Sequence, residues 1–150
     1  MFEIKNTLNE RIHRAKKITT THLEKEQFLT HGFAWIATYV EGLNQLLCWA
    51  ENLENQGKLS LVETLILQIG FGEYLAQIKG GIPMSQSEII RLEHFKLDTA
   101  TLKVFNCKAV QTLIRFGNID AARKKLVDCL TLSRGLSTHC ETGLDSDHEL

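Results

Sequence analysis

The sequence has little proline, little net charge and no closely spaced cysteines, and each shortage narrows what the protein can be. One proline in 150 residues leaves little to interrupt helices. A net charge of −1 does not favour nucleic acid or an anionic membrane as a partner. No apolar run approaches the roughly 18 residues that a membrane-spanning helix requires. No two cysteines have the C-x-x-C spacing of common zinc or redox motifs.

The composition that remains is that of an ordinary globular domain. The 150 residues are 43% hydrophobic and 23% charged, enough for one domain with a real core. The N-terminal stretch is basic and amphipathic, but it contains Glu3 and Glu10 and no small-residue cleavage site. It is therefore not expected to be a signal or transit peptide, and a cytoplasmic location is expected.

The cysteines and histidines give little indication of a metal site. The cysteines are Cys48, Cys107, Cys129 and Cys140, and the first three fall within helical patterns. We expect them to be reduced and to act mainly as small apolar side chains. A zinc site formed by His139, Cys140 and His148 would lie in a polar tail, and the six histidines include no HExxH pair. No metal ion is expected, and the histidines are expected to be solvated or to cap helices.

Apolar residues recur at helical spacing through most of the chain, and no alternating strand pattern is apparent. Helices are predicted at about 4–18, 30–56, 60–79, 85–94, 98–116 and 119–130. In the first, the apolar stripe is Ile4, Leu8, Ile12, Ala15 and Ile18. The fold is therefore expected to be all-α: an antiparallel bundle of five or six helices over residues 1–133, followed by a flexible polar tail over 134–150.

Two serines have the spacing of a capping box, in which a serine hydroxyl and a glutamate three residues later satisfy free backbone N–H groups. Ser60 precedes Glu63, and Ser85 precedes Glu88. Each pair predicts a helix start. Between them, Gly80-Gly81 and Pro83 predict the end of the preceding helix.

Glycines at positions 70 and 72 lie inside the predicted helix 60–79, whose apolar residues cover nearly all of its circumference. A phosphate-binding loop is not indicated, because no strand precedes the glycines, Leu75 stands where the dinucleotide fingerprint needs its third glycine, and no Gly-Lys-Ser/Thr follows. We expect instead a central helix in which Gly72 lets a neighbouring backbone approach closely and Gly70 does the same for another helix.

Glu73 lies on an apolar face of the same predicted helix. A carboxylate in that position should be protonated, paired with a cation or turned toward a polar pocket. One interpretation is a general base or a ligand-binding carboxylate, which makes Glu73 a weak catalytic candidate. The other is a buried ion pair, for example with Arg91 or Arg115.

Several stretches resemble a known family. The segment HGFAWIATYVEGLNQLLCWAENL and the later segments FGEYLAQ and GGIPMSQ are similar to the N-terminal helical extension of methylsuccinyl-CoA dehydrogenase-type enzymes, in the acyl-CoA dehydrogenase superfamily. The close resemblance covers residues 31–91, and a looser one continues through 121–127 to Gly143-Leu144-Asp145. In the family, the dehydrogenase module would begin near this point. The last 20 residues of this sequence differ, because a polar stretch stands where the start of that module is expected.

The resemblance implies an extension similar to the helical bundle that closes acyl-CoA dehydrogenase subunits. Those enzymes bind FAD, abstract an α-proton with a carboxylate and pass hydride to the flavin. The base, the flavin-binding domain and most of the CoA site belong to a module that these 150 residues do not contain. Glu73 matches an extension motif, so the family's catalytic role is not transferred to it, and no cofactor-binding residue is assigned.

The expected function is a non-catalytic helical domain that packs on or assembles with a dehydrogenase module, or associates with itself through an apolar helix face. Alone, the chain is expected to be inactive and to bind no FAD. One alternative is a free-standing helical protein-interaction module. Another is a bundle that binds a small molecule in a pocket of Glu73 with the aromatic residues Trp35, Tyr39 and Tyr74.

Overall fold

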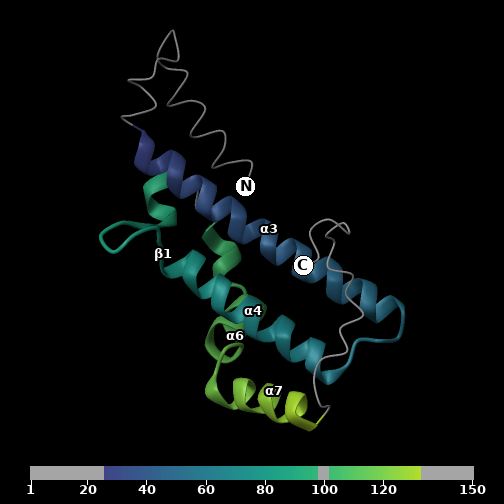
Figure 1. Cartoon of the computed structure of the whole chain (residues 1–150). Helices are drawn as coiled ribbons and strands as arrows, with labels where there is room; N and C mark the ends of the chain where they lie inside the picture. Colours follow the sequence, from purple (N-terminus) through teal and green to yellow (C-terminus); the bar gives the residue numbers. More distant parts are fainter. Residues whose placement is uncertain (1–25, 98–101, 133–150) are drawn as a thin grey trace, which may run out of the picture.

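The computed structural model describes residues 26–97 and 102–132, and these ranges are mostly helical (Figure 1). The α-helices are α3 (Gln27–Asn55), α4 (Leu61–Gly80), α6 (Lys108–Phe116) and α7 (Asp120–Leu132). Two short strands, β1 (Ile82–Pro83) and β2 (Ile89–Ile90), follow α4, and two 3-10 turns, η1 (Leu92–Phe95) and η2 (Val104–Asn106), precede α6. The predicted helix 4–18 and the predicted tail 134–150 lie outside the described ranges.

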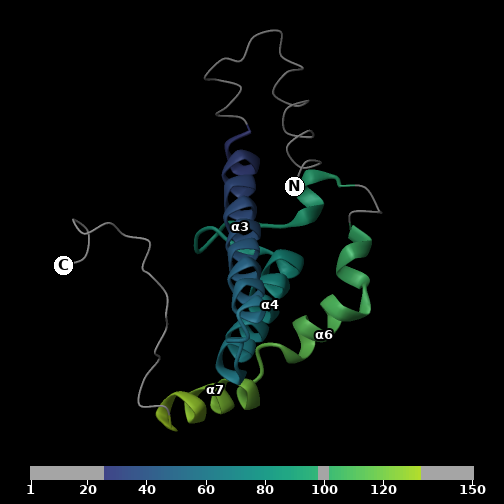
Figure 2. The same cartoon turned by 90° about the vertical axis from the view of Figure 1, so that its right-hand side faces the viewer.

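Helix α4 is the centre of the arrangement, as its all-round apolar sequence predicts. It packs against α3, α6 and α7. The turn at 56–60 sends α4 back along α3, and α6 and α7 lie on the other side of α4 (Figures 1 and 2). The predicted helices 30–56 and 60–79 are confirmed. The count of five or six helices is not, because the described ranges contain four α-helices.

The first predicted capping box is present. The Ser60 hydroxyl accepts the backbone N–H of Val62 at 3.1 Å, and the Glu63 carboxylate accepts the backbone N–H of Ser60 at 3.0 Å. Hydrogen bonding to Ser60 lowers the pKa of Glu63, which keeps its charge at the positive end of the α4 dipole.

The second predicted capping box is wrong. Residues 82–90 form an antiparallel hairpin in which Ile82 pairs with Ile90, and the backbone N–H groups of Met84 and Ser85 donate to the Glu88 carbonyl at 2.8 and 3.3 Å. The chain leaves α4 through Gly81 at φ +119°, a conformation that favours glycine. Pairing the strands places Ile82 and Ile90 in the core, and this tertiary gain outweighs the local helix signal. The expectation that the chain has no strands is corrected with it.

Substituting Ser60 and Ser85 separately should distinguish the true cap from the false one. We expect Ser60→Ala to lower the free energy of unfolding by about 1 kcal/mol, because α4 loses its N-cap. Ser85→Ala should change it by about 0.5 kcal/mol or less, because its exposed side chain caps no helix. Urea unfolding followed by circular dichroism measures both. Equal losses would contradict the assignment.

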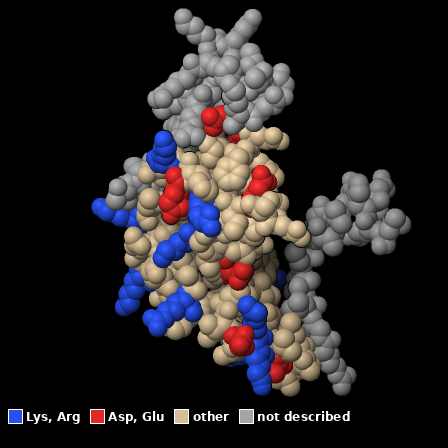
Figure 3. Space-filling model, turned by 90° about the vertical axis from the view of Figure 1, so that its left-hand side faces the viewer, with Lys and Arg blue, Asp and Glu red and all other residues tan. Residues whose placement is uncertain are grey.

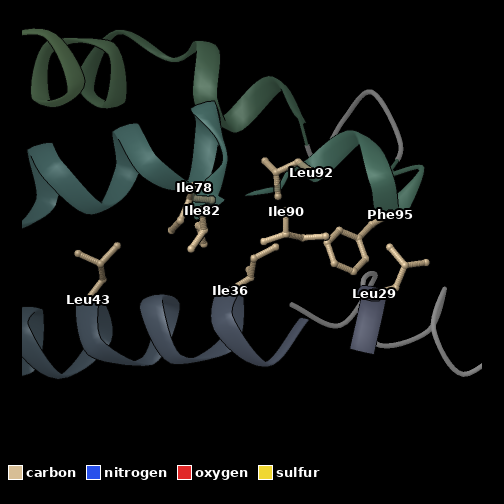
Figure 4. Packing of buried hydrophobic residues seen from close by; sticks show 8 residues of the cluster. All are labelled: Leu29, Ile36, Leu43, Ile78, Ile82, Ile90, Leu92 and Phe95. Carbon is tan, nitrogen blue, oxygen red and sulfur yellow. The ribbon is translucent and has the colours of Figure 1, made fainter. Parts of the chain in front are cut away.

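The core lies between residues 29–43 of α3, the end of α4, the hairpin and η1 (Figure 4). Its buried members are Leu29, Ile36, Leu43, Ile78, Ile82, Ile90, Leu92 and Phe95. The Phe95 side chain is fully buried, and Figure 4 shows it next to Ile90 and Leu29. The core therefore joins α3 to the segment after α4, and the turns at 81–95 have a structural role that their irregular sequence does not suggest.

The sixth predicted helix is confirmed as α7, and the last part of the fifth is confirmed as α6, residues 108–116. Cys107 has ψ 147°, an extended conformation that separates η2 from α6. Asp98, the predicted cap, lies outside the described residues. The cysteine prediction is partly wrong: Cys48 and Cys107 are exposed, and Cys129 is half-buried. Cys140 and His139 are outside the described ranges.

Candidate functional site

The close contact that brings α4 to the turn between α6 and α7 is made by two glycines. A Cβ added to Gly72 would lie 2.8 Å from the Gly117 Cα and 2.8 Å from the Asn118 backbone nitrogen. One added to Gly117 would lie 2.7 Å from the Gln68 carbonyl oxygen. The expected close approach at Gly72 is confirmed, and its partner is the 117–118 turn. The contact places Asn118 beside Gly72 of α4, and Glu73 is the next residue of that helix.

The expected approach at Gly70 is also confirmed, although its partner is a side chain. An added Cβ there would lie 2.8 Å from the Leu46 Cδ2 of α3. Both glycines lie inside a helix, and protein atoms fill the space beside them. Neither glycine therefore offers its backbone N–H group to a phosphate.

Glu73 is the centre of a chain of hydrogen bonds that links three helices. Its Oε1 accepts the Gln77 side-chain amide at 2.6 Å, and its Oε2 accepts the Asn118 side-chain amide. The Tyr39 hydroxyl donates to Gln77 Oε1 at 2.8 Å, and Arg123 Nε donates to Asn118 Oδ1 at 2.6 Å. We refer to these five residues as the polar network. It connects α3 to α4 and α4 to α7.

The network holds Glu73 in its ionised form. Hydrogen bonds from Gln77 and Asn118, with a smaller attraction from Arg123, lower the pKa of Glu73 against the opposing effect of burial. Burial, with smaller contributions from Tyr74 and Glu73, raises the pKa of Tyr39, so its hydroxyl stays protonated and donates to Gln77.

The predicted surroundings of Glu73 are corrected. The side chain is half-buried, and Arg123 is the cation that acts on it, in place of Arg91 or Arg115. Arg115 instead lies over the Phe116 ring, with 5.1 Å from its guanidinium carbon to the ring centroid. The Arg91 side chain lies beside Gly81, at the hairpin.

Four aromatic rings, three from α3 and one from α4, extend from the polar network. Tyr39 meets Tyr74 edge-to-face with centroids 4.7 Å apart, and Trp35 meets Tyr39 at 6.2 Å. The Trp35 indole N–H donates to His31 Nε2 at 2.9 Å. The three aromatic residues of the predicted pocket are therefore neighbours, and Gln77 links them to Glu73. Edge-to-face rings in direct contact fill space between side chains and stiffen the α3–α4 contact.

The sequence indicates Glu73 but not its partners. Gln77, one helical turn later, could have been found from the i, i+4 rule, since amide and carboxylate side chains at that spacing meet. Asn118 and Arg123 are 45 and 50 positions away along the chain. Their contribution depends on the Gly72–Gly117 contact, and no local pattern predicts which residues that contact brings together.

The chemistry of this arrangement suits positioning better than proton transfer. A lowered pKa makes the Glu73 carboxylate a weaker base, and both of its oxygens already accept hydrogen bonds. In residues 26–97 and 102–132, no group of three or more His, Cys, Asp or Glu side chains could hold a metal ion. On the face seen in Figure 3, Lys and Arg side chains lie mainly toward the left edge, with Asp and Glu among and beside them.

Replacing Glu73 by glutamine should destabilise the fold modestly and alter its response to pH. Because Gln77 and Asn118 both donate to Glu73, a glutamine NH₂ would face one of these donors, and we expect a loss of about 1 kcal/mol at pH 7. The folded pKa of Glu73 is below its ordinary value of 4.5, so its stabilising effect is present above that pH and is lost as the pH falls through the folded pKa.

The measurement is the difference in unfolding free energy between the natural chain and Glu73→Gln, from urea titrations at pH 7 and at steps below pH 4.5. The difference should shrink toward acid. Glu41→Gln is the control. It removes a carboxylate that accepts only the Gln45 amide, on an exposed part of α3. A difference for Glu73→Gln that does not change with pH would contradict the role of its charge.

The sequence was compared with known proteins, and one match is to part of a larger enzyme. No protein-family model matches the chain. Over 146 residues, 97% of its length, the chain is 43% identical to (2S)-methylsuccinyl-CoA dehydrogenase of Cereibacter sphaeroides. The chain therefore matches a segment of an acyl-CoA dehydrogenase, and the resemblance seen in the sequence is confirmed. It spans only 26% of the length of that protein.

No helix in the described part of the chain is long and apolar enough to cross a membrane.

Proposed function

We propose that the chain is a non-catalytic helical domain that packs on the flavin-binding part of an acyl-CoA dehydrogenase. The observation that carries the proposal is the uneven coverage of the match: nearly all of this chain aligns with about a quarter of the enzyme. The whole enzyme's activity therefore needs residues that these 150 do not include. A domain of this kind would help to assemble the enzyme or cover part of its active site.

In the described residues the glycines of α4 do not form a Rossmann-type phosphate-binding loop, and this supports a non-catalytic role. A Rossmann-type dinucleotide site needs glycines whose backbone N–H groups approach the phosphates. Gly70 and Gly72 instead face Leu46 and the 117–118 turn, inside a continuous helix. FAD implied by the enzyme would then be held by the dehydrogenase module, where it would accept hydride from the acyl-CoA.

Exposed apolar side chains on η2, α6 and α7 are the part of the chain that we expect the module to cover. The large apolar side chains Val104, Phe116, Ile119 and Val127 are all exposed there. Exposed apolar side chains on successive elements are typical of protein-interaction surfaces. The proposed location is cytoplasmic, with the dehydrogenase module as the partner.

Mixing the purified chain with a flavin-loaded acyl-CoA dehydrogenase module that lacks this segment tests the proposal. We expect a 1:1 complex on size-exclusion chromatography with light scattering, while the chain alone carries no flavin absorbance and oxidises no acyl-CoA. Phe116→Asp should weaken the complex, and Thr38→Asp, on exposed α3, should not. Flavin binding and acyl-CoA oxidation by the chain alone would overturn the proposal. Self-association without binding to the module would replace it by a homo-oligomer.

A further inference from the structure

Helix α3 carries two apolar stripes, of which one is buried in the core and the other is largely exposed beyond its first residue. Ile36, Leu43 and Ala50 recur every seven residues and are buried. Phe33, Val40 and Leu47 recur at the same interval on the adjacent flank, which we call the outer stripe. Phe33 is half-buried and packs against the core, whereas Val40 is 38% and Leu47 41% exposed. An apolar stripe on a regular repeat is the pattern that a second helix packs against.

The charge of α3 has one sign. Between Gln27 and Asn55 the helix contains Glu41, Glu51 and Glu54 and no lysine or arginine, a net charge of −3. All three glutamates are exposed. A segment that covers the outer stripe would therefore be favoured if it were both apolar on one face and basic beside it.

Residues 4–18 of the same chain have that composition. Their predicted apolar stripe is Ile4, Leu8, Ile12, Ala15 and Ile18. The basic residues among them are Lys5, Arg11, Arg14, Lys16 and Lys17, and the single acid is Glu10, so five positive charges and one negative give +4. We propose that residues 4–18 pack as a helix antiparallel to α3, with this apolar stripe on the outer stripe.

The lengths agree with this arrangement. From Ile4 to Ile18 a helix rises about 21 Å, the same as α3 rises from Phe33 to Leu47. Residues 19–26 provide the turn, and eight residues lie within the usual length of a connection between antiparallel helices. The register that follows places Ile18 near Phe33, Ile12 near Val40 and Ile4 near Leu47. This inference does not depend on the proposed dehydrogenase partner.

Cross-linking in the full chain tests both the occupant and the register. In a background with the four native cysteines replaced by serine, Ile12→Cys is combined with Val40→Cys, on the outer stripe, or with Thr38→Cys, on an exposed position on the opposite side of α3. Under a mild oxidant we expect the first pair to form an intramolecular disulfide at least tenfold faster than the second. Circular dichroism of the reduced variants checks that both are folded.

The other possible occupants give different results. A disulfide that links two chains would show that a second copy covers the outer stripe, and equal rates for the two pairs would show that residues 4–18 do not. Either result overturns the proposal. Acceleration of the first pair only after the dehydrogenase module is added would also overturn it, because the segment should already be seated in the chain alone.

A second measurement uses the natural chain and needs no substitution. Amide hydrogens of residues 8–16 should exchange at least tenfold more slowly in the full chain than in a synthetic peptide of residues 1–20. Exchange at the same rate in both would overturn the proposal, whatever the cysteine variants show.

Discussion

Replacing Phe95 with alanine should lower the free energy of unfolding by about 3–5 kcal/mol, a larger loss than any other substitution proposed for this chain. The ring is fully buried where η1 meets α3 and the hairpin, so its removal leaves a cavity that the short, constrained turns on either side cannot easily close. Urea unfolding followed by far-ultraviolet circular dichroism measures the loss. Such a loss would take a large part of the roughly 5–15 kcal/mol that stabilises an ordinary domain.

Phe116→Ala is the matched control for Phe95→Ala. It deletes the same ring at the end of α6, where Phe116 is 49% exposed. The expected loss in the isolated chain is about 1 kcal/mol or less, because folding buries only part of this ring and its removal forfeits little buried apolar surface. If the two substitutions had the same effect, the core would not be centred on η1 and the hairpin.

Introducing a methyl group at Gly72 should give the second large effect. Alanine favours a helix over glycine by about 1 kcal/mol, so local propensity alone predicts stabilisation. At Gly72, however, the new Cβ would meet backbone atoms of Gly117 and Asn118 at 2.8 Å, and a backbone contact cannot be relieved by rotating a side chain. We expect Gly72→Ala to lower the free energy of unfolding by about 1–3 kcal/mol.

The other glycines of the same helices supply the controls. Gly42, in α3, has open space where a Cβ would be, and Gly42→Ala should stabilise the chain by about 1 kcal/mol. Gly70→Ala should fall between the two, because its neighbour is the flexible end of Leu46. The order of midpoints in urea should be Gly42→Ala, Gly70→Ala, Gly72→Ala, from highest to lowest. Stabilisation by Gly72→Ala would show that α4 and the 117–118 turn are not in contact.

Helices α3 and α4 could be predicted because the sequence signals for their ends are local. The Ser60–Glu63 cap and the glycines at the end of α4 each involve a few neighbouring residues, and their effect does not depend on the rest of the chain. The same local logic failed at Ser85. There the gain from burying Ile82 and Ile90 depends on α3, which is distant in sequence, and the capping-box spacing carries no information about it.

The candidate site shows the same division. The pattern identified Glu73 as unusual and Trp35, Tyr39 and Tyr74 as possible neighbours, and the contacts among the aromatic rings are present. An arginine was expected to pair with Glu73, and the arginine that acts on it is Arg123. Which arginine is near depends on how the α6–α7 turn lies against Gly72. Helical periodicity gives the direction in which a side chain points, but not which distant residue it meets.

The position of the two tryptophans has a practical consequence for optical experiments. Trp35 and Trp49 both lie on α3, and both are half-buried. The intrinsic fluorescence of the chain therefore reports on the surroundings of one helix only. A partner that binds over η2, α6 and α7 should leave the emission spectrum nearly unchanged. A partner that binds to α3, or displaces a segment packed on it, should shift the spectrum. A titration read at the tryptophan band would thus tell which side of the molecule a partner engages.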